Sequence, residues 1–316
     1  MKKRLSFFFK CALSAGLLFY LLRRVDFHLL WETFRHVSLG FVLLALVTLF
    51  LFHAASALRW RFVGKYLALN QRFSFFWRVY LIGVYFNTFL PGILGGDLVR
   101  VFYLVREGAG KAAASASIIY DRGFGLLAAL FLVLIFLPWE GAFLPPLLRR
   151  ALFYLCGGSL VLVLGLILAL GPVRRRLSHE MLLMLTSVTP WRRFLVLFIL
   201  GLLVQVLYAV HVFFLARGLG VEGAWGKFFL IVPLTGILAS LPISLGGFGV
   251  REGTLAYFLG LLGYPTEIGV ALGFLVYGVN LVVGLVGLLV YLRRPNEVPQ
   301  EDLYPHQGRA VDHGQP

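Results

Sequence analysis

Apolar residues along the chain group into eight long segments that are separated by short polar connections. The segments cover approximately 5–22, 38–58, 73–90, 115–137, 151–170, 194–216, 226–245 and 266–292. Most of them approach or exceed the roughly 20 residues that a helix needs to cross a bilayer. No connection is long enough to form a separate soluble domain. The pattern predicts an all-α polytopic membrane protein with six to eight transmembrane segments.

A ten-residue motif occurs twice, each time where an apolar segment ends. PGILGGDLVR, from Pro91 to Arg100, returns 151 positions later as PISLGGFGVR, from Pro242 to Arg251, and both fit P-x-x-L-G-G-x-x-V-R. Proline and paired glycines interrupt helices. Helix breaks at matching positions of two halves of a hydrophobic chain point to the binding site of a transporter.

The distribution of Lys and Arg predicts how the segments cross the membrane. Basic residues concentrate on the cytoplasmic side, but eight full crossings divide them almost evenly and put the 174–193 cluster outside. If 73–90 and 226–245 instead enter, break and return, about nineteen basic residues lie inside and about eight outside. We therefore expect two re-entrant segments from opposite sides, six crossings, cytoplasmic termini and an inverted repeat.

These expectations set the domain boundaries. Residues 1–294 are predicted to form one transmembrane domain, with repeat halves at approximately 38–137 and 194–292. Residues 295–316 are polar and rich in proline, which predicts a disordered tail. Because two irregular backbone segments at membrane depth must be covered by protein or line a watered cavity, both breaks are expected to meet a shared cavity.

Composition supports the membrane class and narrows the chemistry. The chain is 60% hydrophobic and 14% charged, whereas soluble domains are about 45–50% apolar. The net charge of +15 is assigned to topology and anionic headgroups, and no nucleic-acid partner is expected. Cys11 and Cys156 have no neighbours that suggest a metal site or disulfide. We expect neither cofactor, metal nor enzymatic activity, since no hydrolase, zinc or nucleotide-binding motif occurs.

The first break supplies one group of candidate substrate-binding residues. The group is Asn87, Pro91, Gly95, Gly96, Asp97 and Arg100. The glycines are expected to turn through positive φ, so that a new helix begins near Leu98 and points its amino end into the cavity. Arg100 would add a fork suited to phosphate or carboxylate. The alternative is that Asp97 only caps the helix while Arg100 reaches the surface.

The second break supplies a corresponding but chemically different group. The group is Pro242, Ser244, Gly246, Gly247, Gly249, Arg251 and Glu252. Phe248 occupies the position of Asp97, so the two halves are not equivalent. Arg251 and Glu252 either take part in binding or form an interfacial ion pair of little energetic value.

Asp121 and Arg122 form a third candidate group, just inside the 115–137 segment. Charged residues within an apolar helix are costly, so by default they face the bundle interior and take part in function. The alternative is a pair at the helix end, by the cytoplasmic interface. A weaker repeat concerns His53 and His211, each six residues before an arginine, Arg59 and Arg217.

These motifs carry a resemblance to a known family. The matching elements are Leu58-Arg59-Trp60-Arg61, Asn87-Thr88-Phe89-Leu90-Pro91-Gly92 running into Gly95-Gly96-Asp97 and Arg100, Asp121-Arg122, and Pro242-x-Ser244-x-Gly246-Gly247-x-Gly249-x-Arg251-Glu252. Over residues 5–292 the chain resembles the flippase-like transmembrane region of lysylphosphatidylglycerol synthases. The soluble synthase domain that follows this region in full-length members is not expected here, so aminoacyl transfer is not implied.

The resemblance implies movement of a lipid across the cytoplasmic membrane. The substrate would be an anionic or aminoacylated phospholipid or a polyprenyl-linked lipid, and a separate lipid-modifying enzyme or glycosyltransferase is a candidate partner. Two other hypotheses remain open at this point. One is a non-transporting membrane anchor for such an enzyme, and the other is an intramembrane enzyme that uses Asp97, Asp121 or Glu252.

Overall fold

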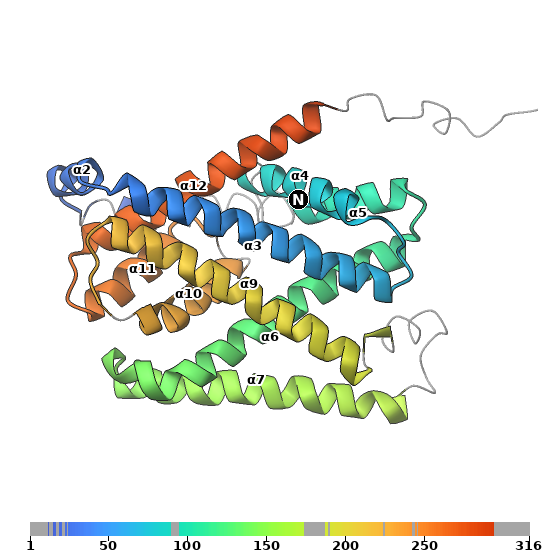
Figure 1. Cartoon of the computed structure of the whole chain (residues 1–316). Coiled ribbons are helices and arrows are strands. Elements are labelled where there is room, and N and C mark those ends of the chain that lie inside the picture. The colour runs from blue at the N-terminus through green and yellow to red at the C-terminus, as the bar shows by residue number, and fades with distance from the viewer. Residues whose placement is uncertain are drawn as a thin grey trace, which may run out of the picture.

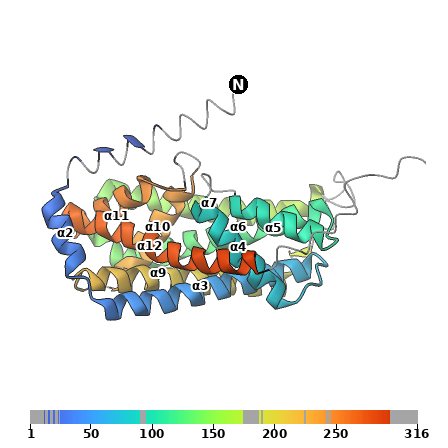
Figure 2. The same ribbon diagram turned by 90° about the horizontal axis from the view of Figure 1, so that it is seen from above.

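The structure is a computed structural model in which the chain forms a bundle of long helices (Figures 1 and 2). It describes residues 12, 15–16, 19–20, 23, 25–89, 95–173, 187–188, 190–223, 225–241, 244 and 246–293. Ten α-helices and no strands lie within these residues. They are α2 Phe27–Arg35, α3 Leu39–Tyr66, α4 Phe73–Phe89, α5 Gly95–Arg106, α6 Lys111–Glu140, α7 Pro146–Val173, α9 Trp191–Gly218, α10 Trp225–Ser240, α11 Val250–Leu261 and α12 Thr266–Leu292, with a 3-10 turn at Gly141–Phe143.

Five of the described helices are long and apolar enough to cross a membrane: α3, α6, α7, α9 and α12. The chain is therefore a multi-pass membrane protein, as predicted. The predicted segment 5–22 lies largely outside the described residues, and so do the tail 295–316 and most of 174–193. Several helices run past the apolar segments, because polar and basic residues continue the helix: α3 extends from the predicted 58 to Tyr66 and carries Lys65 in its last turn.

The helices that follow α3 and α9 match in order and length. α3 and α9 each have 28 residues, α4 and α10 have 17 and 16, α5 and α11 have 12 each, and α6 and α12 have 30 and 27. α9 begins 152 positions after α3, and α10 begins 152 positions after α4. The two halves of the chain thus contain the same sequence of long, short, short and long helices.

Each pair of short helices folds back on itself. α4 packs on α5, and residues at both outer ends of this pair, such as Leu69 and Ala109, share one apolar cluster with Trp60 of α3. α10 packs on α11, and its outer ends are joined by Tyr264, whose hydroxyl donates to the Glu222 carbonyl oxygen at 2.7 Å. In each pair the chain therefore enters and leaves at the same end.

The two folded-back pairs lie at opposite ends of the bundle (Figure 1). The backbone N–H of Ser38, before α3, donates to the Gly218 oxygen at the end of α9 at 3.0 Å, so α3 and α9 run antiparallel. The α4–α5 pair lies near the end of α3, and the α10–α11 pair lies near the end of α9. The inner ends of both pairs, at Phe89 of α4 and Ser240 of α10, consequently lie toward the middle of the protein.

Long helices of each half pack on the short pair of the other half. α12 crosses α4 at two glycines. A Cβ added at Gly284 would lie 3.5 Å from Thr88, and one added at Gly287 would lie 3.2 Å from Tyr85. α6 crosses α10, where the rings of Phe136 and Phe229 stack with centroids 4.8 Å apart. Small residues and stacked rings let membrane helices approach closely. These two sets of contacts hold the two halves together at the middle of the bundle.

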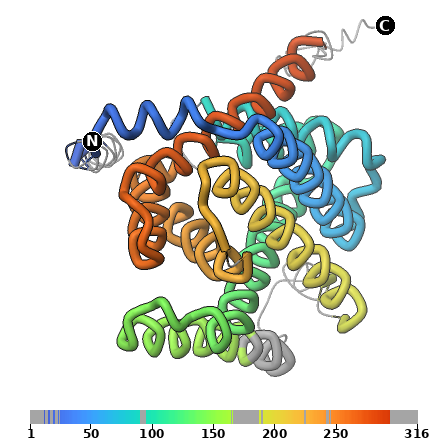
Figure 3. The backbone as a smooth tube through the Cα atoms, turned by 60° about the vertical axis from the view of Figure 1, so that its left-hand side comes forward, coloured from blue at the N-terminus to red at the C-terminus, as the bar shows by residue number. Residues whose placement is uncertain are grey.

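α7 lies at the side of the bundle and packs mainly on α6 (Figure 3). In its most apolar stretch, Pro146–Val163, only 6% of the residues are buried. Most of its surface is therefore left for lipid or for another protein, and α7 takes no part in positioning the central residues.

The expected correspondence of His53 and His211 is not present. His53 is the fifteenth residue of α3, whereas His211 is the twenty-first residue of α9. The residue of α3 at the same position as His211 is Arg59. The shared six-residue spacing to an arginine therefore does not reflect matching places in the two halves.

Candidate functional site

A cavity of about 900 Å³ lies between the two halves and reaches both helix breaks. Thr88 and Phe89 line it just before the first break, and Ser240 and Gly246 line it at the second. The prediction that residues at both breaks meet a shared cavity is confirmed for the described residues. Polar and apolar side chains from α3, α4, α6, α9, α10 and α12 complete the wall.

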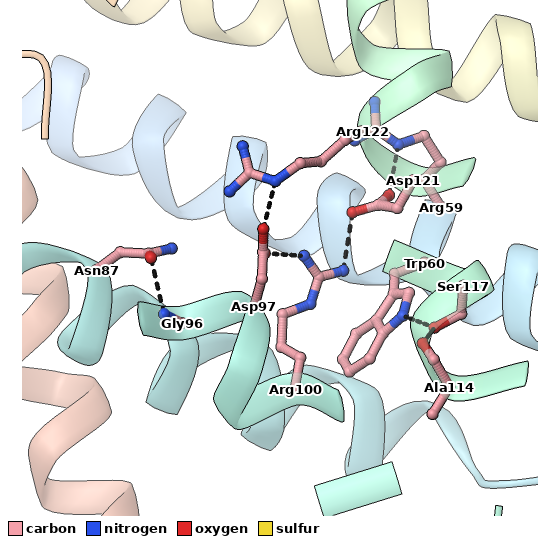
Figure 4. A network of polar contacts seen from close by, with 10 residues as sticks. All are labelled: Arg59, Trp60, Asn87, Gly96, Asp97, Arg100, Ala114, Ser117, Asp121 and Arg122. Carbon is pink, nitrogen blue, oxygen red and sulfur yellow. Dashed lines mark hydrogen bonds and ion pairs between the residues drawn. The ribbon is translucent and has the colours of Figure 1, made fainter. Parts of the chain in front are cut away.

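One wall of the cavity carries five charged side chains in an alternating series (Figure 4). Arg59 Nε donates to Asp121 Oδ1 at 2.8 Å, and Arg100 Nη2 donates to Asp121 Oδ2 at 2.8 Å. Arg100 Nη1 also donates to Asp97 Oδ1 at 3.4 Å, and Arg122 Nε donates to Asp97 Oδ2. We call Arg59, Asp121, Arg100, Asp97 and Arg122 the ionic chain. It joins α3, α5 and α6.

The ionic chain is buried well inside the helices. Asp121 is 2% exposed and Arg100 is 6% exposed, whereas the side chain of Arg122 is 44% exposed and ends the series. Arg59 lies seven residues before the end of α3 at Tyr66, which is about 10 Å along a helix axis. Ions at such depth persist only when they are paired and hydrogen-bonded. The alternating series meets this requirement for both carboxylates.

Two aromatic rings also pack against the guanidinium of Arg100. Its guanidinium lies 4.0 Å from the ring centroid of Trp60 and 5.0 Å from that of Tyr80. Trp60 is itself fixed, because its Nε1 donates to Ser117 Oγ at 3.1 Å and Ser117 donates to the Ala114 oxygen at 2.7 Å. A planar guanidinium that stacks on an aromatic face and binds two carboxylates has little freedom to move.

The backbone after the first break differs from the expected turn. α5 begins at Gly95, three residues before the predicted start, and Gly95 and Gly96 are helical rather than at positive φ. Glycine is required at 96 by close packing: its N–H donates to Asn87 Oδ1 at 2.8 Å, and a Cβ there would lie 2.6 Å from Asn87 Nδ2. The prediction of a glycine turn at this position was therefore wrong.

The contacts of Asp97 and Arg100 do not fit the alternative in which Asp97 only caps the helix and Arg100 reaches the surface. Asp97 lies in the first turn of α5, but its carboxylate binds Arg100 and Arg122 instead of only capping the helix. Arg100 does not reach the surface, and its guanidinium is held by Asp121 and Asp97. Arg122 and Asp121 do not pair with each other, since each binds a partner on a different helix.

The second break has the glycine turn that was expected of Gly95 and Gly96 at the first. Gly246, Gly247 and Gly249 have φ of 59°, 82° and 79°, values that side chains rarely adopt. The Gly249 N–H donates to Glu252 Oε2 at 2.7 Å, so the buried Glu252 caps α11. Arg251 Nη2 donates to the Gly246 oxygen at 3.3 Å. No ion pair between Arg251 and Glu252 occurs among the described residues, so the expected interfacial pair is not formed.

The cavity includes about half of the predicted site residues. Asn87, Asp97, Arg100, Asp121, Arg122, Gly246 and Arg251 line it. Gly95, Gly96, Ser244, Gly247, Gly249 and Glu252 do not, and they shape the backbone at its edge. Pro91 and Pro242 lie outside the described residues. At the position of Asp97, Phe248 packs edge to face on Tyr277 with centroids 4.6 Å apart, and no ion pair occurs among the described residues of α9 to α12.

Several lining residues were absent from the sequence-based candidates. They are Phe52, His53, Arg59, Tyr80, Gln205, Tyr208, Thr235, Tyr277 and Asn280. Arg59 belonged to the Leu58-Arg59-Trp60-Arg61 motif, but it lay one residue past the predicted segment 38–58, so its place inside α3 was not expected. The neutral residues had no signal in the sequence, because their positions give no indication of which helix face meets the cavity. Among the described residues no group of three or more His, Cys, Asp or Glu could hold a metal ion.

The fold and the site together define a class of membrane proteins: helical and multi-pass, with a cavity that carries charged side chains between two halves of similar helix order. Within that class, the chain matches the family model described as the lysylphosphatidylglycerol synthase TM region over residues 7–287, and it belongs to that family. A comparison with curated proteins gives no match. The family assignment agrees with the predicted resemblance and supports a lipid-related membrane protein.

Proposed function

We propose that the protein translocates a lipid across the cytoplasmic membrane. The observation that carries the proposal is the cavity between the halves, which is lined within the helix bundle by the ionic chain and by Arg251 from the other half. Charged residues within a membrane bundle mark the path of a polar substrate. Membership of a family named for lysylphosphatidylglycerol synthases supports a lipid as that substrate. Translocation is proposed without catalysis.

The folded-back pairs are proposed to be re-entrant in the membrane and related by an inverted repeat. Support comes from the matched helix lengths, from the return of each pair to its own end, and from the opposite ends at which the pairs lie. Inverted repeats with broken helices that meet at a central site are common in secondary transporters. In this arrangement both termini of the transmembrane domain are cytoplasmic.

A cycle follows from this arrangement. The headgroup of an anionic or aminoacylated phospholipid, or of a polyprenyl-linked lipid, enters the cavity while its acyl chains stay in the bilayer. Rocking of one half against the other then exposes the cavity to each leaflet in turn. The ionic chain fixes α3, α5 and α6 to one another, so the first half moves as a unit, and the movement is taken up where α12 crosses α4 and α6 crosses α10.

Reconstitution tests the proposal. The purified chain is placed in liposomes that contain fluorescent phosphatidylglycerol, lysyl-phosphatidylglycerol or a labelled polyprenyl phosphate, and exposure of each lipid on the outer leaflet is followed over time. We expect faster transbilayer movement than in protein-free liposomes for at least one of them, and its loss in Arg100→Ala. Rates equal to those of protein-free liposomes for all three lipids would overturn the proposal.

A second candidate function is that of a non-transporting anchor for a lipid-modifying enzyme or glycosyltransferase. The exposed surface of α7 favours it, since this helix packs mainly on α6 and can accept another membrane helix. The two functions predict different effects of substitutions in the cavity. An anchor retains its effect in Arg100→Ala and Arg251→Ala provided that the complex assembles, whereas a transporter does not.

A further inference from the structure

The cavity has more positive than negative charge. Four arginines line it, Arg59, Arg100, Arg122 and Arg251, against two acids, Asp97 and Asp121. Among the described lining residues the formal balance is therefore two positive charges. An excess of cationic side chains on the cavity wall favours the entry of an anion.

The carboxylates of the cavity are already occupied. Asp121 Oδ1 and Oδ2 accept from Arg59 and Arg100, and Asp97 Oδ1 and Oδ2 accept from Arg100 and Arg122. All four oxygens of the two acids thus bind guanidinium groups. Each oxygen keeps a second lone pair, but a carboxylate whose charge is already balanced by two guanidinium groups attracts an ammonium group only weakly.

The unsatisfied groups of the same cavity include donors. Arg59 Nη1 and Arg100 Nε are buried and have no acceptor among the described residues. Both arginines are at least nine-tenths buried and line the cavity, at 5% and 6% exposure. These two atoms are enclosed by the wall, so a phosphate would reach them only after a small shift of the arginine side chains, whose guanidinium groups match its oxygens. Neutral polar groups, including Gln205 and Asn280, surround this region and can bind uncharged headgroup atoms.

From these three observations we infer that the transported lipid carries a phosphate headgroup of net negative charge, and that an aminoacylated, cationic headgroup is rejected. The inference rests on the proposed function and narrows its substrate. The ionic chain and Arg251 bind the phosphate from the two halves of the cavity. A free lipid phosphate and a phosphodiester lipid share this chemistry, and the experiment distinguishes them.

Competitive binding tests the inference directly. The full chain in detergent is mixed with equal amounts of phosphatidylglycerol and lysyl-phosphatidylglycerol with identical acyl chains, and native mass spectrometry counts the lipids that remain bound. Doubly N-acetylated lysyl-phosphatidylglycerol keeps the size of the aminoacyl group and restores the negative charge. Polyprenyl phosphate and a neutral glucosyl diacylglycerol complete the series.

We expect the chain to bind phosphatidylglycerol at least tenfold better than lysyl-phosphatidylglycerol, and to bind the acetylated lipid about as well as phosphatidylglycerol. The neutral glycolipid is expected to bind poorly. The ratio of bound phosphatidylglycerol to bound polyprenyl phosphate shows whether the site prefers a phosphodiester lipid or a free lipid phosphate. Equal or better binding of lysyl-phosphatidylglycerol would overturn the inference, and so would equally poor binding of the acetylated lipid, because size and not charge would then decide.

Two variants connect the preference to the cavity. Arg251→Gln is expected to reduce the preference for phosphatidylglycerol about tenfold, while Arg251→Lys retains most of it because the charge remains. Arg217→Gln is the matched control, because Arg217 lies near the end of α9 against the ring of Phe41, and it does not line the cavity. An unchanged preference in Arg251→Gln contradicts the role of this arginine in binding.

Parallel liposome assays separate this inference from the proposed function. Selective transbilayer movement of lysyl-phosphatidylglycerol would overturn the headgroup inference and leave lipid translocation standing. Selective binding of phosphatidylglycerol without movement of any lipid would overturn translocation. Movement of the anionic lipids with exclusion of the cationic one supports both.

Discussion

The carboxylate of Asp121 in α6 receives hydrogen bonds from two arginines on other helices, with Arg100 Nη2 and Arg59 Nε each at 2.8 Å. One buried acid therefore links α3, α5 and α6. Because Arg59 and Arg100 are also buried, neither can recover hydration if Asp121 is lost. The stability of the first half and the shape of the cavity wall both depend on this carboxylate.

Replacing Asp121 with Asn is expected to destabilise the protein by about 3–5 kcal/mol, because the buried Arg59 loses its carboxylate partner and Arg100 keeps only Asp97, at 3.4 Å. Thermal unfolding in detergent, followed by tryptophan fluorescence, measures the change. Asp26→Asn is the control, because Asp26 caps the short helix α2 at the surface and Asn caps equally well. A loss below about 1 kcal/mol in Asp121→Asn would show that the ionic chain does not hold these helices.

Asp97→Asn is expected to affect transport more than stability. Its contact with Arg100 is the longest in the ionic chain, 3.4 Å, and its other partner, Arg122, is partly exposed and can be hydrated. We expect lipid movement in liposomes to fall at least tenfold while the unfolding temperature falls less than in Asp121→Asn. Wild-type movement in Asp97→Asn would contradict the view that this acid, which only one half supplies, is needed for the cycle.

Gly96→Ala is expected to disrupt the packing of α5 on α4. The added Cβ would lie 2.6 Å from Asn87 Nδ2 and against the Gly83 oxygen, and backbone cannot move aside as a flexible side chain can. A loss of about 1–3 kcal/mol is expected from such overpacking. Gly260→Ala in α11 meets no atom within 4 Å, and by helix propensity it should be neutral or stabilising by about 0.5–1 kcal/mol. Equal unfolding temperatures for the two variants would contradict this packing.

Ser117→Ala should loosen Trp60, because it removes the acceptor of the buried indole N–H and leaves that group unsatisfied. The expected cost is about 1–3 kcal/mol, measured by thermal unfolding. Ser159→Ala is the matched control, since Ser159 donates only to its own helix α7 at an exposed position, and a change within about 0.5 kcal/mol is expected. A small effect in both variants would show that Trp60 does not need this hydrogen bond to hold Arg100.

Cysteine labelling tests the two re-entrant pairs. In a chain without Cys11 and Cys156, Asn70→Cys and Glu107→Cys should react with a membrane-impermeant maleimide from the same side, because these exposed residues flank the α4–α5 pair. Glu222→Cys and Thr266→Cys, which flank the α10–α11 pair, should react from the opposite side. If α4 or α10 crossed the membrane completely, the two members of a pair would label from different sides.

The repeated motif shows how far the sequence alone could be interpreted. It placed both helix breaks correctly, between α4 and α5 and between α10 and α11, because proline and paired glycine together at the end of an apolar segment disfavour a continuous helix. It did not show which glycines turn. Gly246 and Gly247 have positive φ, whereas Gly95 and Gly96 continue a helix and are small because Asn87 and Gly83 approach them.

Charged residues that are adjacent along the chain do not pair with each other here. Asp121 and Arg122 are neighbours, but successive residues of a helix point about 100° apart and cannot face the same partner. Asp121 therefore binds α3 and α5 through Arg59 and Arg100, while Arg122 reaches Asp97. Likewise Glu252 binds the Gly249 N–H at the start of its own helix and not the adjacent Arg251.

The amino-acid sequence by itself determined the membrane class, the apolar helices, the two breaks and the family, because all of these depend on local composition and spacing. Only the tertiary structure decided which charged residues pair and that Arg59 completes the ionic chain. It also decided that four arginines and only two acids line the cavity. These features depend on contacts between residues far apart in the chain, such as Arg59 and Asp121, 62 positions apart. Their energies arise from burial and mutual geometry, which exist only once the helices have packed.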